Sequence, residues 1–170
     1  MLDMKLILLF GILYLGFFNK SIGQSDSLKL PVSFILDSSK GPELLRQCSR
    51  AIPSHITAYW TLSLTDKINL EANFYKIESL TANECCIMGL KLKTYKGFAF
   101  QYAGVIIKKR KYIYINAFPE SELEEFLKMS IVIDISKSPM IICDGGSNYW
   151  GALYDIKSKT FKHLSFNGSL

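Results

Sequence analysis

Histidine is scarce in this sequence, and the local motifs of hydrolases and nucleotide-binding proteins are missing. Only His55 and His163 occur among 170 residues, and neither belongs to a known nucleophile arrangement with serine, cysteine or carboxylate. There is no Gly-x-Ser-x-Gly elbow, no His-Glu-x-x-His pair and no phosphate-cradling loop. Because histidine is the usual acid–base group near neutral pH, the sequence indicates no particular reaction. Both histidines are expected to be surface residues or hydrogen-bonded ones.

Apolar runs long enough to cross a bilayer are also missing. The longest, Leu6–Phe18, is shorter than the roughly 20 residues that a spanning helix needs. Lys5 precedes it, and the small residues Ser21 and Gly23 follow in the arrangement that a signal peptidase accepts. The pattern predicts a signal peptide over residues 1–23, with an uncleaved anchor as the alternative. The mature chain is expected to be soluble, periplasmic or secreted, without stable membrane insertion.

The remaining residues, 24–170, have the size and composition of one ordinary domain. Apolar residues make up 49% of the chain and aromatic residues 13%, which argues against disorder. The net charge of +5 falls to about +4 without the signal peptide, and this small excess predicts no nucleic-acid partner. Part of it lies in the cluster Lys108–Lys111. That cluster could contact an acidic partner or a lipid surface, but such charges are more typical of a solvated hairpin turn.

Cysteine is limited to Cys48, Cys85, Cys86 and Cys143, which would enter an oxidising compartment after export. Four cysteines allow three pairings. Adjacent cysteines rarely bond each other, so we predict a bridge between Cys48, at the end of a helix, and Cys143, at the end of a strand. Cys85 and Cys86 are then free thiols or a vicinal pair. No spacing indicates a metal site, and no cofactor is predicted.

Hydropathy periods predict an α+β protein. Helices are expected over residues 42–49, 68–80 and 120–129, and strands over 30–36, 98–107, 112–118, 140–143, 149–154 and 160–166, with 56–62 a loop or a short strand. Two pairs of these strands form hairpins. We predict an antiparallel sheet of about four or five strands, with helices packed mainly on one face.

The segment Cys143–Gly151 is the strongest candidate for a binding site. It contains Asp144, Gly145, Gly146, Asn148, Tyr149 and Trp150. The loop could present its aromatic residues to a partner or hold a ligand through Asp144, because Trp and Tyr are common interface hot spots. The alternative is a turn between strands, with Trp150 in the core.

Two arginines form a second candidate cluster beside Cys48. Arg46 and Arg50 would approach Asp144 if Cys48 bonds Cys143. The resulting Arg–Asp pair could be a binding pocket or a salt bridge that fastens the helix to the sheet.

Several segments together resemble a type of small exported bacterial protein of unknown function. They are Gln47–Arg50, Gln101–Gly104, Tyr112–Phe118, Cys143–Gly146, Trp150–Gly151, Tyr154–Asp155 and Phe166–Gly168. The resemblance covers most of the mature chain and implies a bacterial envelope or secreted setting, but no activity and no catalytic residues. The Cys85–Cys86 pair is not part of that pattern.

Export, a disulfide and the absence of catalytic motifs predict a non-catalytic binding protein. Its partner would be another envelope or secreted protein, in the manner of an inhibitor or an immunity protein. One alternative is an enzyme that acts on an anionic substrate through Asp144 or a cysteine. Another is a structural component of the envelope.

Overall fold

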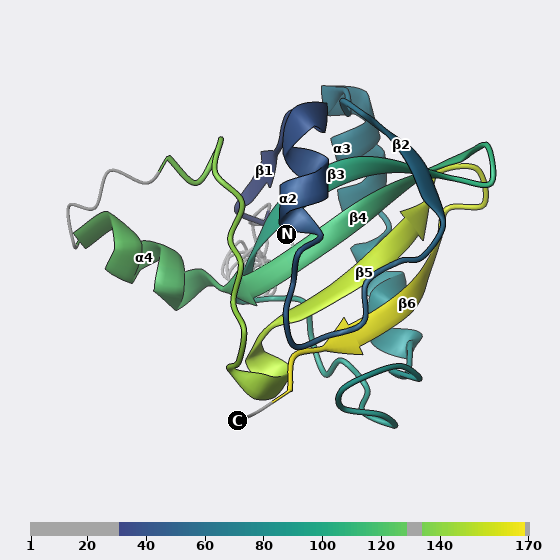
Figure 1. Cartoon of the computed structure of the whole chain (residues 1–170). Helices are drawn as coiled ribbons and strands as arrows, with labels where there is room; N and C mark the ends of the chain where they lie inside the picture. Colours follow the sequence, from purple (N-terminus) through teal and green to yellow (C-terminus); the bar gives the residue numbers. More distant parts are fainter. Residues whose placement is uncertain (1–30, 129–133, 169–170) are drawn as a thin grey trace, which may run out of the picture.

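The chain folds around a mixed β-sheet. The computed structural model describes residues 31–128 and 134–168, so the predicted signal peptide lies outside the described residues. Within these ranges six strands pair in one sheet, in the order β1-β3-β4-β5-β6, with β2 also paired to β3 (Figure 1). The strands are β1 (Ser33–Ile35), β2 (Ile56–Trp60), β3 (Phe98–Ile107), β4 (Arg110–Pro119), β5 (Trp150–Asp155) and β6 (Thr160–Phe166).

Short helices connect the strands. They are the 3₁₀ helix η1 (Ser38–Lys40), α2 (Gly41–Leu44), α3 (Leu64–Glu71), the 3₁₀ helix η2 (Phe74–Ser79), α4 (Glu120–Lys128) and the 3₁₀ helix η3 (Gly146–Asn148). A capping box begins α3: the Ser63 hydroxyl accepts from the Asp66 amide, and the Asp66 carboxylate accepts from the Ser63 amide. No helix in the described ranges is long and apolar enough to cross a membrane.

Both predicted hairpins are confirmed. β3 pairs antiparallel with β4, which places Ile107 opposite Arg110 beside the first turn. β5 pairs antiparallel with β6, which places Asp155 opposite Thr160 beside the second turn. Because β4 also pairs with β5, the two turns lie next to each other at one end of the sheet (Figure 1).

The α+β class is confirmed, but the prediction of an antiparallel sheet is wrong in one respect. β1 runs parallel to β3, with Ser33 opposite Phe100 and Ile35 opposite Tyr102. β2 pairs antiparallel with the other half of β3, so two short strands share one edge. A hydropathy pattern reports which residues are buried, and it carries no information on the direction of an edge strand of three residues.

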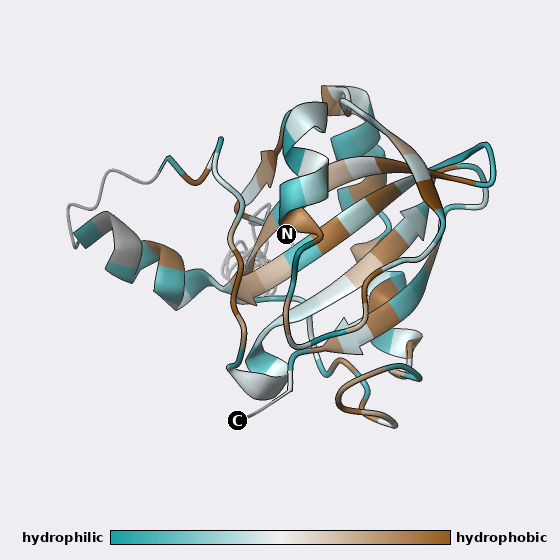
Figure 2. Cartoon of the chain, viewed as in Figure 1, coloured by the Kyte–Doolittle hydropathy of each residue, from teal (hydrophilic) through white to brown (hydrophobic). Residues whose placement is uncertain are grey.

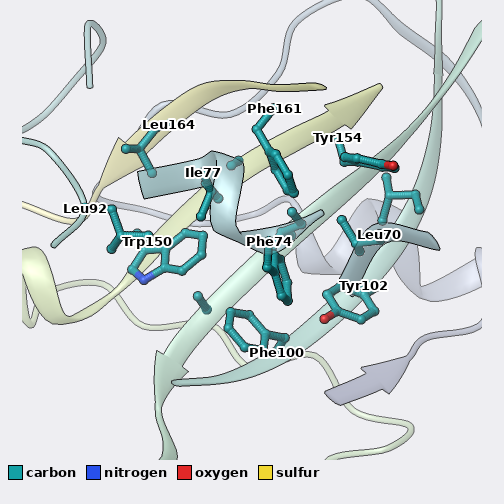
Figure 3. Packing of buried hydrophobic residues seen from close by; sticks show 14 of the residues in the cluster. Leu70, Phe74, Ile77, Leu92, Phe100, Tyr102, Trp150, Tyr154, Phe161 and Leu164 are labelled. Carbon is teal, nitrogen blue, oxygen red and sulfur yellow. The ribbon is translucent and has the colours of Figure 1, made fainter. Parts of the chain in front are cut away.

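One face of the sheet packs against α3 and η2. Leu70 and Ile77 from these helices are fully buried there, together with Trp150 from β5 (Figure 3). The ring of Phe74 in η2 lies against that of Phe100 in β3, with 4.8 Å between the ring centres. Full burial of each such side chain contributes about 1.5–3 kcal/mol, so these contacts hold the helical layer on the sheet.

The opposite face packs against α2 and the loop that follows it. Leu44 and Leu45 are buried against Ala103, Val105 and Tyr114. Successive residues of a strand point to opposite faces, so β3 and β4 supply both cores. Figure 2 shows the apolar residues along these strands and the hydrophilic turn between them. Helices therefore cover both faces of the sheet, with the longer ones, α3 and η2, together on one face.

The expected strand at residues 140–143 is not formed. The Met140 carbonyl accepts hydrogen bonds from Asn116 Nδ2 (2.9 Å) and Gln47 Nε2 (3.0 Å), and the Met140 amide donates to Gln101 Oε1 (2.8 Å). Side-chain amides thus satisfy the backbone groups that a strand would have paired. The segment crosses the sheet as an extended loop.

Candidate functional site

Two disulfides use all four cysteines. Cys48 bonds Cys143, with 4.9 Å between their α-carbons, as the sequence predicts. Cys85 bonds Cys86, which is the vicinal alternative. No cysteine is therefore a free thiol. The cysteine-based form of an enzyme has no nucleophile in this oxidised state.

Gly145, directly before η3, lets an aromatic ring pack over the backbone. Gly145 has φ = 88°, and a β-carbon there would lie 2.2 Å from the Tyr149 ring. Burial raises the pKa of Tyr149 to about 12, with further contributions from a hydrogen bond to Glu122 and from nearby negative charges. Gly145 thus has a local structural reason, since a side chain at this position would collide with the Tyr149 ring.

The remaining members of the predicted loop site do not converge. Trp150 has no exposed surface, as expected of the alternative in which it belongs to the core. Asp144 and Asn148 are exposed and belong to a solvated turn. The backbone carbonyl of Asp144 accepts a hydrogen bond from Asn167 Nδ2 at 2.9 Å. This carbonyl, and not the carboxylate, links Asp144 to the rest of the fold.

The expected pairing of an arginine with Asp144 is not formed among the described residues. Arg46 is exposed. Arg50 is buried, and its Nη2 donates to Asn116 Oδ1 on β4 instead. The bridge brings Cys48 to Cys143, but the side chain of Arg50 points to the sheet and not to the Asp144 turn.

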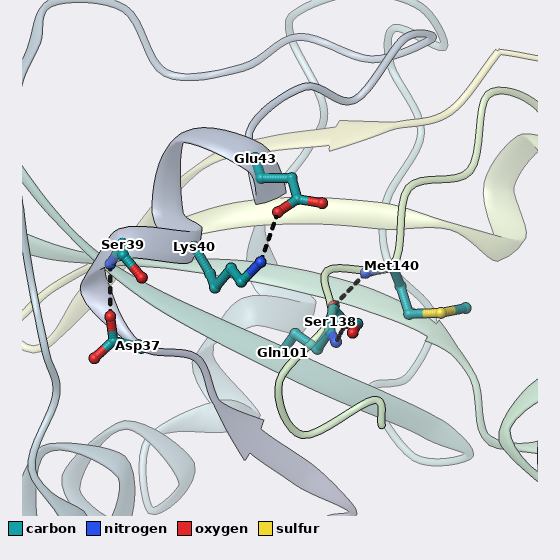
Figure 4. A network of polar contacts seen from close by, with 7 residues as sticks. All are labelled: Asp37, Ser39, Lys40, Glu43, Gln101, Ser138 and Met140. Atoms are coloured by element: carbon teal, nitrogen blue, oxygen red, sulfur yellow. Dashed lines mark hydrogen bonds and ion pairs between the residues drawn. The ribbon is translucent and has the colours of Figure 1, made fainter. Parts of the chain in front are cut away.

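A buried polar network connects Arg50 to the loop over the sheet. Asn116 Nδ2 donates to Gln101 Oε1 (3.4 Å), and Gln101 Nε2 donates to the carbonyls of Ile135 and Ser138, both at 2.8 Å. Figure 4 shows the Gln101 side chain directed at Ser138 and Met140 of this loop. Every amide group in this network is paired, which fixes the loop against β3 and β4.

Seven cationic side chains of the described chain gather where the two hairpin turns lie side by side. They are Lys108, Lys109, Arg110, Lys111, Lys157, Lys159 and Lys162, and we call this group the basic end. Asp155 is the only acid in the segments 107–111 and 155–162. It pairs with Arg110 at 2.7 Å, and the other six cations form no ion pair among the described residues.

Backbone geometry does not explain the lysines at these turns. Lys108 and Lys109 are the two turn residues of the first hairpin, with φ = 49° and 64°, and Lys159 in the neighbouring turn has φ = 54°. Asn and Gly are the preferred residues for such left-handed positions, and other residues cost roughly 1 kcal/mol each. Strained residues retained at a surface are a reason to look for a function of their side chains.

Two of these lysines lie over aromatic rings. Lys162 Nζ is 4.0 Å from the centre of the Tyr112 ring, and Lys111 Nζ is 4.6 Å from that of Trp60. A ring face attracts a cation, so these contacts fix the ammonium groups at the surface of the sheet. The basic end is therefore partly preorganised.

Asp155 holds the second turn together. Burial acts to raise the pKa of its carboxyl, but hydrogen bonds from the amides of Ser158 and Lys157 and the nearby positive charges lower the pKa below its usual value. The amide distances are 3.0 Å from Lys157 and 3.3 Å from Ser158. The single acid thus shapes the turn and offsets only one of seven cations.

The sequence interpretation missed the extent of the basic end. It treated Lys108–Lys111 alone, as a solvated turn. The second predicted hairpin already held Lys157, Lys159 and Lys162 near its turn. A prediction that β4 pairs with β5 would have placed both turns together.

The fold and the basic end define an α+β protein with a cationic surface. Comparison with protein-family models, curated proteins and solved structures gave no match to this chain. Among the described residues, no group of three or more His, Cys, Asp or Glu could hold a metal ion.

Proposed function

We propose that this chain is an exported, non-catalytic binding protein that docks on an acidic surface of another envelope or secreted protein. The basic end is the docking surface. The observation that carries the proposal is the set of three lysines in left-handed turn positions, Lys108, Lys109 and Lys159, within a group that has one acid. Two disulfides fit the oxidising compartment that export implies.

Electrostatics supports an acidic partner. Like charges within the Debye length of about 8 Å at physiological salt repel one another, so seven cations around two adjacent turns raise the energy of the free protein. An acidic surface relieves this repulsion and accelerates encounter. Trp60, which lies beneath Lys111 and is partly exposed, adds apolar contact area of the kind found at interface hot spots.

The enzymatic alternative lacks a comparable group of side chains. Asp144 is exposed and forms no ion pair with a described residue, and all four cysteines are bonded. His163 pairs with Glu84 across 2.6 Å at the surface. A His–Glu contact without a nucleophile is more typical of a surface ion pair than of a catalytic centre.

The test compares three forms of the chain, each produced by secretion so that the disulfides form. The first is unchanged. The second is Lys108→Asn/Lys109→Gly, which removes two charges and gives the turn its preferred residues. The third, Lys91→Gln/Lys93→Gln, removes two exposed lysines from the segment before β3 and serves as the matched control. Each is used as bait for envelope and medium extracts of the native organism.

The expected result is one stoichiometric protein partner that binds the unchanged chain and the control. The turn variant should retain at most a tenth of the affinity, and added salt should weaken the complex. Equal capture by all three forms would reject the basic end as the docking surface. Binding to vesicles with anionic lipid, without any protein partner, would replace the proposal with a lipid surface.

A further inference from the structure

We propose that Arg50 and the hydroxyl of Tyr114 bind a small monovalent anion on the face of the sheet that carries α2. This site is separate from the basic end and does not depend on the function proposed above. It rests on polar groups that the protein buries without giving them a partner.

Arg50 is a cation without a counter-charge. Its side chain is 5% exposed, and no ion pair includes it among the described residues. Nη2 donates to Asn116, whereas Nε and Nη1 are buried without a hydrogen-bond partner. Arginine stays protonated at any physiological pH, so the charge cannot be relieved by proton loss. A buried guanidinium of this kind is unfavourable unless an anion accompanies it.

The rest of the surrounding network is complete. Gln47 Nε2 donates to the carbonyls of Leu44 (2.8 Å) and Met140 (3.0 Å), and Asn116 and Gln101 use both their donors and their acceptors. The unpaired nitrogens of Arg50 thus lie beside side-chain amides that are paired, and the neighbouring Ser49 Oγ and Asn167 Oδ1 are further buried atoms without a partner. A buried polar group without a hydrogen-bond partner is rare in a folded protein and calls for an explanation. A bound ion that pairs with the group is one such explanation.

Tyr114 supplies a second unpaired donor close to the first. Its hydroxyl is buried and has no partner. A β-carbon on Gly151 would lie 2.9 Å from this hydroxyl and 3.2 Å from Arg50 Cζ. The hydroxyl oxygen and Arg50 Cζ are therefore at most about 6 Å apart. One acceptor that takes a hydrogen bond of about 2.9 Å from each group can bridge a separation up to this value.

These distances select the chemistry of the ligand. The donors are a cationic guanidinium and a neutral hydroxyl, so an anion suits them better than water, which leaves the charge uncompensated. The Tyr114 hydroxyl and Arg50 Nε and Nη1 are buried, so an ion between them is closed off from solvent. A single-centre ion such as chloride or bromide needs the least space between the two groups, so it suits them better than a large organic anion.

The test measures the midpoint of thermal unfolding of the full secreted chain. Sodium chloride is raised from about 1 to about 200 mM in logarithmic steps. Sodium gluconate keeps the ionic strength constant, so the screening of surface charges does not change. A ligand of the folded state raises the folding equilibrium constant by 1 + [L]/Kd, which is about 100-fold at 100 times Kd. Tyr114→Phe keeps the ring and removes one donor, so its midpoint should respond less to chloride. Tyr112→Phe, in the same strand, is the matched control.

A second measurement does not depend on a variant. Crystals grown in sodium bromide should show an anomalous peak between the Arg50 guanidinium and the Tyr114 hydroxyl. A chloride-dependent midpoint that Tyr114→Phe weakens, together with this peak, supports the site. The proposal is overturned if chloride and gluconate act alike, if Tyr114→Phe and Tyr112→Phe respond to chloride as the unchanged chain does, or if the bromide peak is absent.

Discussion

Gly151 on β5 lies directly against the guanidinium of Arg50. A β-carbon at position 151 would come within 3.2 Å of Arg50 Cζ and 3.1 Å of the Ile115 carbonyl oxygen, which is backbone and cannot move aside easily. The glycine is therefore what permits Arg50 to reach Asn116 across β5. This close approach can be tested on its own, without reference to any ligand.

We expect Gly151→Ala to lower the free energy of unfolding by about 1–3 kcal/mol, because the added methyl overpacks a fully buried position. Urea unfolding measures the change. Gly146→Ala is the control: Gly146 has φ = 59° but nothing within 4 Å of a β-carbon, so only the backbone cost of about 1 kcal/mol applies. An unchanged stability in Gly151→Ala would show that Arg50 does not occupy this position in solution.

The two disulfides are expected to contribute very differently to stability. Cys48 and Cys143 are 95 residues apart, and in the chain-entropy model a bridge that closes such a loop contributes about 4–5 kcal/mol. Cys85 and Cys86 are 1 residue apart and close no loop. The variant Cys48→Ala/Cys143→Ala should therefore unfold at much lower urea than Cys85→Ala/Cys86→Ala. Equal midpoints for the two variants would contradict the entropic account.

The Asp155 carboxyl should make stability depend on pH in the acidic range. Its pKa is lower in the folded state than in the unfolded chain, so it stabilises the fold above the unfolded pKa of about 4. That contribution is lost as the pH falls through the folded-state pKa. Asp155→Asn should be less stable than the unchanged chain at pH 7 by up to about 1.5–3 kcal/mol, the range for hydrogen bonds to a charged group.

The free energy of unfolding of the unchanged chain and of Asp155→Asn, each measured as a function of pH, checks this account. The difference between the unchanged chain and Asp155→Asn should shrink as the pH falls from 5 to 2, a range set by about two units around the unfolded pKa. Hydrogen bonds with Lys137 and Ser136 also lower the pKa of Asp134, but this carboxyl lies at an exposed turn where solvent screens it, so Asp134→Asn should change the curve less. A difference that stays constant over that range would assign the loss to packing rather than to the charge.

Trp150→Ala should unfold the protein rather than remove a surface contact. The side chain has no exposed area and lies edge-on to the rings of Phe98 and Phe100. Truncation of a buried tryptophan costs about 3–5 kcal/mol. Tyr75→Ala, at a residue that is 63% exposed, should change stability by less than about 0.5 kcal/mol. Thermal unfolding of both variants separates the two cases, and a stable, folded Trp150→Ala would place this ring outside the core.

The two hairpins could be predicted because the residues of their strands favour β-structure and the residues between them favour a turn. Phe98–Ile107 and Tyr112–Phe118 are rich in β-branched and aromatic residues and flank a charged turn, and they form β3 and most of β4. The helix from Leu64 also has a local cause, the capping box at Ser63. Information of this kind lies within a few residues of the element that it specifies.

The rest depends on contacts between distant residues. Residues 140–143 are as apolar as a strand, yet Gln101 and Asn116 occupy the hydrogen-bonding groups of Met140. The candidate site shows the same limit. The Cys48–Cys143 bridge could be predicted because both cysteines lie at the ends of predicted elements. The direction of the Arg50 side chain is instead set by its hydrogen bond to Asn116, 66 residues away. The basic end requires the pairing of β4 with β5, which no local pattern specifies.

β4 joins the basic end to the acidic helix α4, and the two lie at opposite ends of the sheet (Figure 1). The strand has 10 residues, which corresponds to about 33 Å. α4 carries Glu120, Glu122, Glu124 and Glu125 against one lysine. These two groups of charges therefore form an electric dipole along β4. Near a negatively charged surface it would experience a torque that turns the hairpins inward and α4 outward before any contact forms, so its collisions would be oriented rather than random.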